Sequence, residues 1–159
     1  MNKQSLIALF VFLALVAIVC GVGLTLYRTQ GLPMAASGQA FGLEMAIDAY
    51  HEQIGSYPPG ESNAEITAAL QGENPEDFDF LLATGIRYEV FIAVQEQPDG
   101  SRVAVDVWKN PLQISIPPTS ESPAVISAGP DGMPGTSDDI TSEKARSLEP
   151  AKRAEDPEA

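Results

Sequence analysis

The chain has 159 residues with 22 acidic and 9 basic side chains, so its formal net charge is −13 and its isoelectric point is about 4.2. This charge argues against nucleic acid as a partner, because phosphate binding needs a basic surface. A single cysteine, Cys20, excludes an intrachain disulfide framework and a multi-cysteine zinc site. The single histidine, His51, excludes histidine clusters, and we expect it to be a solvated helix residue.

The N-terminal part of the chain contains an apolar run, Leu6 to Tyr27, without a charged residue. At about 1.5 Å per helical residue it spans roughly 33 Å, enough to cross the hydrocarbon core of a bilayer. The competing interpretation is a cleavable secretory signal, which has a shorter apolar core and an A-x-A-like site after it. We therefore expect residues 1–30 to form a single transmembrane anchor, with Cys20 facing lipid or packing within it.

A second helix is expected just beyond the anchor. Gly31 and Pro33 are expected to loosen the chain, after which the helical pattern resumes from about Met34 to Ile54. Gly55 ends this helix in the manner of a C-terminal glycine. Its apolar residues recur at spacings of four, three and four and so share one face: Leu43, Ile47, Tyr50 and Ile54.

Two short helices are expected next. Ser62-Asn-Ala-Glu65 has the pattern of a capping box that opens the first of them, with Gly72 closing it. Pro75 suits the first position of the second, because its missing N–H would be unpaired there in any case. The residues expected to be buried are Ile66, Ala69 and Leu70 in the first helix and Phe78, Leu81 and Leu82 in the second.

From Arg87 the apolar period changes from helical to two, which is typical of strands. Gln97-Pro-Asp-Gly100 is a strong hairpin signal between the first two of them. The expected strands are Tyr88–Val94, Arg102–Trp108, Leu112–Ile116 and Ala124–Ser127.

These elements predict an α+β fold in which a long helix covers one face of a small antiparallel sheet. We expect one extracytoplasmic domain over residues 31–141 and a disordered tail over 142–159, because the tail is rich in Glu, Lys, Pro and Ala and has almost no apolar content. The sequence contains no phosphate-binding G-x-x-x-x-G-K loop. No nucleophile–base or acid–base constellation is recognisable, so we do not expect an enzyme.

The segment from Ser127 to Ile140 concentrates three aspartates, Asp131, Asp138 and Asp139, among glycines and prolines. Three carboxylates in one short loop repel one another unless a cation joins them. Oxygen ligands converging through Gly and Pro turns are typical of sites for a hard cation such as Ca²⁺. The alternative is an acidic surface turn, since Pro-Asp-Gly is ordinary turn chemistry.

Four motifs occur in an order that resembles the major pseudopilin of type II secretion systems and its type IV pilin-like relatives. They are Ala49-Tyr-His-Glu-Gln-Ile-Gly-Ser-Tyr-Pro-Pro59, Asp106-Val-Trp-Lys-Asn-Pro111, Ser127-Ala-Gly-Pro-Asp-Gly132 and Gly135-Thr-Ser-Asp-Asp-Ile140. The resemblance covers roughly residues 40–60 and 104–141 with moderately specific motifs. Between them, residues 61–103 match only in general layout.

The resemblance implies a pilin-like fold with a calcium site. Position by position, it places the side-chain ligands at Asp131, Asp138 and Asp139. Backbone carbonyls near Ala128 and in the segment 133–136 are implied to complete the coordination of Ca²⁺. The loop chemistry considered by itself indicates the same three aspartates.

The sequence departs from the family's pattern in two places. The family has a Gly-Phe-Thr-Leu-like prepilin peptidase site followed closely by a Glu, whereas here the apolar run begins at Leu6 and no acid precedes Glu44. The family also usually has Gly and an aromatic residue at the positions of Lys109 and Leu112.

The resemblance implies a structural function in protein secretion: a pseudopilin-like subunit or accessory of a type II secretion system, with a head stabilised by Ca²⁺. It implies a single-pass protein of the bacterial inner membrane whose soluble domain is periplasmic. Its partners would be the membrane, copies of itself, other pseudopilins and secretion-platform proteins. The alternative function is a membrane-tethered, calcium-stabilised binding module that does not polymerise.

Overall fold

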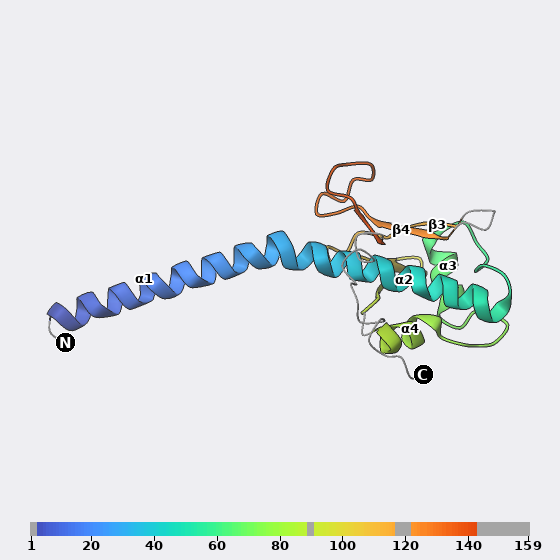
Figure 1. Ribbon diagram of the computed structural model, residues 1–159, viewed down its shortest axis with the longest axis horizontal. Coiled ribbons are helices and arrows are strands. Elements are labelled where there is room, and N and C mark those ends of the chain that lie inside the picture. Colours follow the sequence, from blue (N-terminus) through green and yellow to red (C-terminus); the bar gives the residue numbers. More distant parts are fainter. Residues whose placement is uncertain (1–2, 89–90, 117–121, 143–159) are drawn as a thin grey trace, which may run out of the picture. The chain divides into compact units, whose positions relative to one another are not determined.

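The computed structural model describes residues 3–88, 91–116 and 122–142 (Figure 1). The chain divides into two compact units, Met1–Pro33 and Met34–Ala159, and the second is called the head below. The helical elements are α1 (Lys3–Leu26), the π-helical turn η1 (Tyr27–Gly31), α2 (Leu32–Ile54), α3 (Asn63–Leu70) and α4 (Phe80–Tyr88). The strands are β1 (Ala93–Glu96), β2 (Arg102–Val105), β3 (Gln113–Ser115), β4 (Ala124–Ser127) and β5 (Ile140–Thr141).

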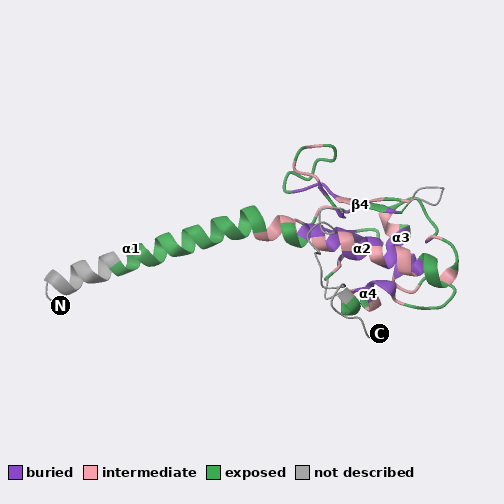
Figure 2. Cartoon of the chain, in the orientation of Figure 1, coloured by how far each residue is buried: buried purple, intermediate pink, exposed green. Residues whose placement is uncertain are grey.

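The first unit consists mainly of α1, which contains most of the predicted anchor. Its described side chains are exposed from Phe12 onward and include Ile18 and Val19, as the green part of α1 in Figure 2 shows. The described helical stretch from Phe12 contains a segment long and apolar enough to cross a membrane. The single cysteine, Cys20, is free and exposed on this helix.

The predicted loosening at Gly31 and Pro33 is wrong, because helical structure continues through both residues. A π-helical turn, η1, joins α1 to α2, and the Leu32 N–H donates to the carbonyl of Tyr27, five residues back. The hydrogen-bond register changes at this point of the helix. Because Pro33 has no N–H group, the change leaves no N–H without a partner at that residue.

The head is built around α2, whose apolar face is buried as predicted. Leu43, Ile47 and Tyr50 are inaccessible or nearly so, and Ile54 is half-buried at the last turn. Gly55 adopts a φ of +85° directly after the helix, and its N–H donates to the His51 carbonyl at 2.9 Å. In Figure 1, β3 and β4 lie on one side of α2 and α4 lies on the other. The buried core draws on every layer: Leu43, Ile47 and Tyr50 of α2, Ile66 and Leu70 of α3, Phe80 of α4, Ala104 of β2, Val125 of β4, and Leu112, which directly precedes β3.

The capping box that opens α3 is confirmed. Ser62 accepts a hydrogen bond from the Glu65 N–H, and the Glu65 carboxylate in return accepts from the Ser62 N–H at 3.1 Å. Ile66, Ala69 and Leu70 are buried, as their spacing predicts. Asn63, the first residue of α3, also holds the sheet: its amide donates to the carbonyls of Ala104 and Leu112 at 3.0 and 2.6 Å.

The expected helix from Pro75 starts later than predicted. The side chain of Asn74 accepts from the Glu76 and Phe78 N–H groups, which makes 74–78 a turn, and Asp79 then caps α4 by accepting from the Leu82 N–H at 2.8 Å. This shift rotates the helix relative to the prediction. Leu81 is buried as expected, whereas Phe78 and Leu82 are exposed and Phe80 is the large buried side chain.

The strands form two small antiparallel sheets, with the orders β1-β2 and β3-β4-β5. The turn Gln97–Gly100 joins β1 to β2 as predicted, and its Gly100 N–H donates to the Gln97 carbonyl at 2.9 Å. The prediction of a strand from Tyr88 is wrong, because α4 continues to Tyr88 and β1 begins at Ala93. Residues 89–90 of that prediction, 117–121 of the predicted loop and 143–159 of the predicted tail lie outside the described residues.

Candidate functional site

The acidic segment closes a β-hairpin. Strands β4 and β5 pair antiparallel, and Ser127 lies opposite Ile140 as the last pair. Both side chains are buried. The strand β5 is only two residues long and was not predicted, yet it brings the two ends of the segment together, so that residues 128–139 form a loop on a buried base.

A buried carboxylate, that of Asp106, supports the start of this loop. Asp106 has no accessible surface. Its Oδ1 accepts from the backbone N–H groups of Trp108 and Asn110, each at 2.9 Å, and its Oδ2 accepts from the Ser127 hydroxyl at 2.6 Å. A buried carboxylate is tolerated only when donors replace its lost water, and the three donors here satisfy that requirement.

Asn110 extends this support into the loop itself. Its Nδ2 donates to the Gly129 carbonyl at 2.8 Å, and the Gly129 N–H donates to Ser127 Oγ at 3.2 Å. Gly132 has a φ of +67°, and a β-carbon there would lie 2.9 Å from Asn110 Oδ1. The turn 106–110 therefore fixes the first half of the loop, from Ser127 to Gly132.

The three predicted ligand residues, Asp131, Asp138 and Asp139, all lie in the loop, and their carboxylates accept hydrogen bonds from its own backbone. Asp131 Oδ1 accepts from the Met133 N–H at 2.7 Å, and Asp139 Oδ2 from the Gly135 N–H at 2.8 Å. Asp138 Oδ2 accepts from the Asp131 N–H at 3.3 Å. The fold thus brings Asp138 to the backbone of Asp131.

Two carboxylates in the second half of the loop, those of Asp138 and Asp139, differ in their hydrogen bonding. The Thr136 hydroxyl donates to Asp138 Oδ1, and this bond together with the Asp131 N–H lowers the pKa of Asp138. Asp139 Oδ1 is buried and has no hydrogen-bond partner among the described residues. Ala128, whose carbonyl the family resemblance implicates, is buried at the base of the loop.

The described residues contain no group of three or more His, Cys, Asp or Glu side chains arranged to hold a metal ion. Asp131, Asp138 and Asp139 share one loop, in which each carboxylate accepts a hydrogen bond from the backbone. What the loop offers is a set of hard oxygen donors on a base that is held from outside by Asp106 and Asn110.

Two of these supporting contacts were not predicted from the sequence. The strand expected over Arg102–Trp108 is shorter than predicted: β2 ends at Val105, so Asp106 lies in the turn that follows it, and Trp108 is half-buried. The signal was present in the Asp106–Pro111 motif, which the structure places against Ser127 and Gly129. Sequence separation alone gave no indication of this contact.

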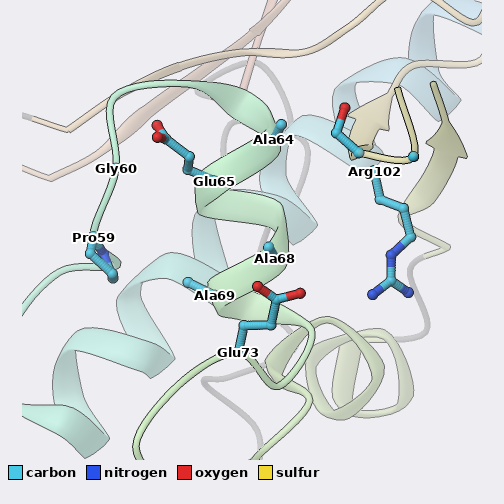
Figure 3. A pocket seen from close by; sticks show the side chains of 10 residues that line it. Pro59, Gly60, Ala64, Glu65, Ala68, Ala69, Glu73 and Arg102 are labelled. Carbon is cyan, nitrogen blue, oxygen red and sulfur yellow. The ribbon is translucent and has the colours of Figure 1, made fainter. Parts of the chain in front are cut away.

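An open hollow of about 520 Å³ lies elsewhere in the head, between α3 and the turn that joins β1 to β2 (Figure 3). Its wall includes Glu65, and the hydrogen bonds that the Ser62 hydroxyl and nearby N–H groups donate to this carboxylate lower its pKa. Glu73 and Arg102 lie at other points of the wall, and the floor is formed by small residues such as Ala64 and Ala68. Glu65 is committed to capping α3, so this hollow does not present it as a free acid or base.

A second hollow, of about 370 Å³, lies between α2 and α4. Burial raises the pKa of Asp48 on its wall, Glu52 raises it further, and His51 acts in the opposite direction. His51 is exposed and stacks on Tyr57 with ring centroids 4.2 Å apart. Aromatic packing therefore accounts for the position of His51.

Comparison of the chain with protein-family models, with curated proteins and with solved structures yields no match.

Proposed function

We propose that this protein is a membrane-anchored structural subunit, similar to the pseudopilins of type II secretion systems, with a head stabilised by Ca²⁺ in the loop 128–139. The order of its parts supports this proposal. An apolar helix suited to a membrane precedes α2, α2 is the central packing element of the head, and small antiparallel sheets cover it. The proposed location is the bacterial inner membrane, with the head in the periplasm.

The calcium proposal rests above all on Asp139. Its Oδ1 is buried without a hydrogen-bond partner in the described part of the chain, and it follows Asp138, whose carboxylate accepts from the Asp131 N–H. An unpartnered buried carboxylate oxygen is costly, and a cation would supply the missing interaction. The atoms available to bind a cation are carboxylate and carbonyl oxygens, which are the ligands that Ca²⁺ prefers.

Asp131, Asp138 and Asp139 are the side chains that would hold the ion, together with the backbone carbonyl of Ala128. The two positive charges of the bound ion would offset most of the repulsion among the three carboxylates of the loop. Asp106 and Asn110 hold the start of the loop in place through hydrogen bonds to Ser127 and Gly129. Because Ser127 belongs to β4, ordering of the loop would also stabilise the β3-β4-β5 sheet. The role is structural.

The experiment is calorimetric melting of the full chain in lipid nanodiscs, with Ca²⁺ and with a chelator. Extracellular calcium modules bind at about 10⁻⁴–10⁻³ M. At 10 mM ion this affinity stabilises a fold by about 1.4–2.7 kcal/mol, which raises its melting temperature by several degrees. The gap should disappear in Asp139→Asn and persist in Glu76→Gln, which removes an exposed acid outside the loop. Equal melting temperatures with and without Ca²⁺ would refute the calcium site.

Assembly needs a separate experiment, because a calcium-stabilised head need not polymerise. Photo-cross-linking of the protein in membranes would measure whether its copies assemble. The experiment is run with and without a co-expressed prepilin peptidase. A ladder of cross-linked species with a mobility shift of the monomer supports the subunit function. A monomer alone, unshifted under both conditions, contradicts it.

The second candidate is a membrane-tethered module that binds a partner without polymerising. Two observations favour it. No acidic residue precedes Glu44, and the head exposes several large apolar side chains, among them Leu82, Ile86 and Phe91. The cross-linking experiment distinguishes this candidate from the subunit.

A further inference from the structure

Helix α4 presents two faces to two different hollows of the head. One face borders the hollow shared with α2 and includes Phe80, Ala83, Thr84 and Arg87. The other face borders an open groove of about 470 Å³, called here the α4–β1 groove. The α4–β1 groove is lined by Gln71, Asp79, Leu81, Leu82, Gly85, Ile86, Phe91, Ile92 and Val94.

The outer wall of the α4–β1 groove consists of large apolar side chains that the head leaves in solvent. Leu82 is 63% exposed, Ile86 73% and Phe91 79%. Single exposed apolar residues are ordinary, but three that line one groove form a patch of the kind that marks an interaction site. Leu81 and Val94 continue the apolar lining inward to the core.

One end of the groove carries hydrogen-bond acceptors. Gln71 and Asp79 face each other there as an isolated β-bridge. Asp79 is the only charged residue among the described residues that line the groove, and one of its oxygens caps α4 at Leu82. Gln71 Oε1 is buried and has no hydrogen-bond partner in the described part of the chain. The Asp79 carboxylate and the unpaired Gln71 oxygen are thus acceptors at this end of the groove.

The charge of the head points in the same direction. Residues 34–142 contain only three basic side chains, Arg87, Arg102 and Lys109, and none of them lines the groove, whereas the whole chain carries a net charge of −13. A second copy of this chain would bring a like-charged surface, which disfavours self-association here. A partner with cationic side chains is complementary to both the groove end and the head.

We propose that the α4–β1 groove docks an amphipathic, basic segment of a partner protein. The apolar side chains of that segment would cover Leu82, Ile86 and Phe91, and a Lys or Arg at its end would reach Asp79. Helix-in-groove recognition uses this combination of apolar anchors and flanking charge. The inference holds for a polymerising subunit and for a tethered module alike, and it does not involve the calcium loop.

The test uses the full chain in nanodiscs of neutral lipid and a fluorescein-labelled 14-residue peptide of leucine and lysine with helical amphipathic spacing. Fluorescence anisotropy gives the dissociation constant, with empty nanodiscs as the reference for binding to lipid. We expect Ile86→Glu and Phe91→Ser each to weaken binding about ten-fold, because each removes a large apolar contact. Asp79→Asn should weaken the binding and flatten its dependence on salt.

The matched control is Met34→Glu, which changes another exposed apolar residue of the head, one that does not line the groove. It should bind the peptide as the unaltered protein does. Circular dichroism should show all four variants folded, since three of them alter exposed positions and Asp79→Asn keeps a side chain that can cap α4. A peptide with glutamate in place of lysine should not bind. Equal binding by the unaltered protein and Ile86→Glu, binding of the acidic peptide, or binding no stronger than to empty nanodiscs would each overturn the proposal.

Self-association is the remaining alternative occupant of the groove. Two separately labelled preparations reconstituted into one vesicle population would report it by energy transfer. Transfer that is lost in Ile86→Glu would assign the groove to a second copy and overturn the proposal. Transfer that is unchanged in Ile86→Glu, together with peptide binding that is lost, supports it.

Discussion

Asp106 and Ser127 lie 21 positions apart, and the Ser127 hydroxyl donates a hydrogen bond of 2.6 Å to the Asp106 carboxylate in the interior of the head. Both side chains have no accessible surface. The same Ser127 oxygen accepts from the Gly129 N–H, so this hydroxyl connects the turn after β2 to the first residues of the acidic loop. The base of the loop therefore depends on a polar contact inside the head.

Removal of the Ser127 hydroxyl should destabilise the whole head. In Ser127→Ala, Asp106 Oδ2 loses its donor while it stays buried, and an unsatisfied buried acceptor costs about 1–3 kcal/mol. The free energy of unfolding from urea titration should fall by that amount. Ser137→Ala, at an exposed serine of the same loop, is the control and should leave the unfolding free energy unchanged. If both variants unfold alike, the Asp106 contact does not stabilise the head.

Lys109 has a backbone conformation that is unfavourable for a residue with a β-carbon. It adopts a φ of +74° in the turn 106–110, a conformation that favours glycine. A left-handed conformation destabilises a residue with a β-carbon by about 1–2 kcal/mol. Glycine avoids this cost, but it also raises the conformational entropy of the unfolded chain, which offsets part of the gain in stability. Lys109→Gly should therefore raise the unfolding free energy by up to about 1 kcal/mol.

The control for this prediction is Lys109→Ala. It removes the exposed charge but keeps the β-carbon and its strain, so its stability should stay close to that of the unaltered protein. Thermal melting of both variants separates the two contributions. A stabilised alanine variant with an unchanged glycine variant would show that charge, rather than backbone strain, governs this position.

Elements with strong local signals were predictable from sequence. The period of α2, its terminal glycine and the capping box of Ser62 and Glu65 involve residues within a few positions of one another, and all three are confirmed. The start of α4 was not predictable, because two side chains compete for it: Pro75 favours a helix start, but Asn74 captures two N–H groups and moves the start past Asp79.

Contacts between distant residues were beyond reach. The strand β5 is two residues long and exists because it pairs with β4. The hydrogen bonds from Ser127 to Asp106 and from Asn110 to Gly129 join residues of two motifs that are separate in the sequence. The sequence indicated that the three aspartates share a loop, which is the case, but not that each carboxylate would accept from the loop's own backbone. Whether they bind Ca²⁺ stays a prediction.

Asp48 should make the stability of the head depend on pH. Burial between α2 and α4 raises its pKa above 3.8, and the neighbouring Glu52 adds to the effect. The folded state thus binds this proton more tightly than the unfolded chain does. The stability that Asp48 contributes is fully present below pH 3.8 and is lost as the pH rises through the raised pKa. Asp48→Asn, which keeps the side chain uncharged, should be more stable than the unaltered protein at pH 7 and equally stable below pH 3.8.

Urea titrations across pH 3 to 8 measure this difference. Glu52→Gln is the informative companion, because it removes the second cause of the shift and leaves burial in place. Carboxyl NMR should then show the pKa of Asp48 moving part of the way down. His51, which acts in the opposite direction, stays unaltered in both variants. A constant stability difference at every pH would contradict the prediction.

Gly129 and Gly135 provide a matched pair for the packing of the acidic loop. Both have a positive φ, +64° and +85°, so alanine is strained at either position by about 1–2 kcal/mol. At Gly129 a β-carbon would also collide with the Asp138 carbonyl and lie 2.6 Å from Asp138 Oδ2, whereas at Gly135 it would meet nothing within 4 Å. Gly129→Ala should therefore lose clearly more stability than Gly135→Ala in urea titration. It should also lose the response to Ca²⁺, because Asp138 must move, while Gly135→Ala keeps that response. Equal losses in the two variants would show that the close approach of Gly129 to Asp138 does not organise the loop.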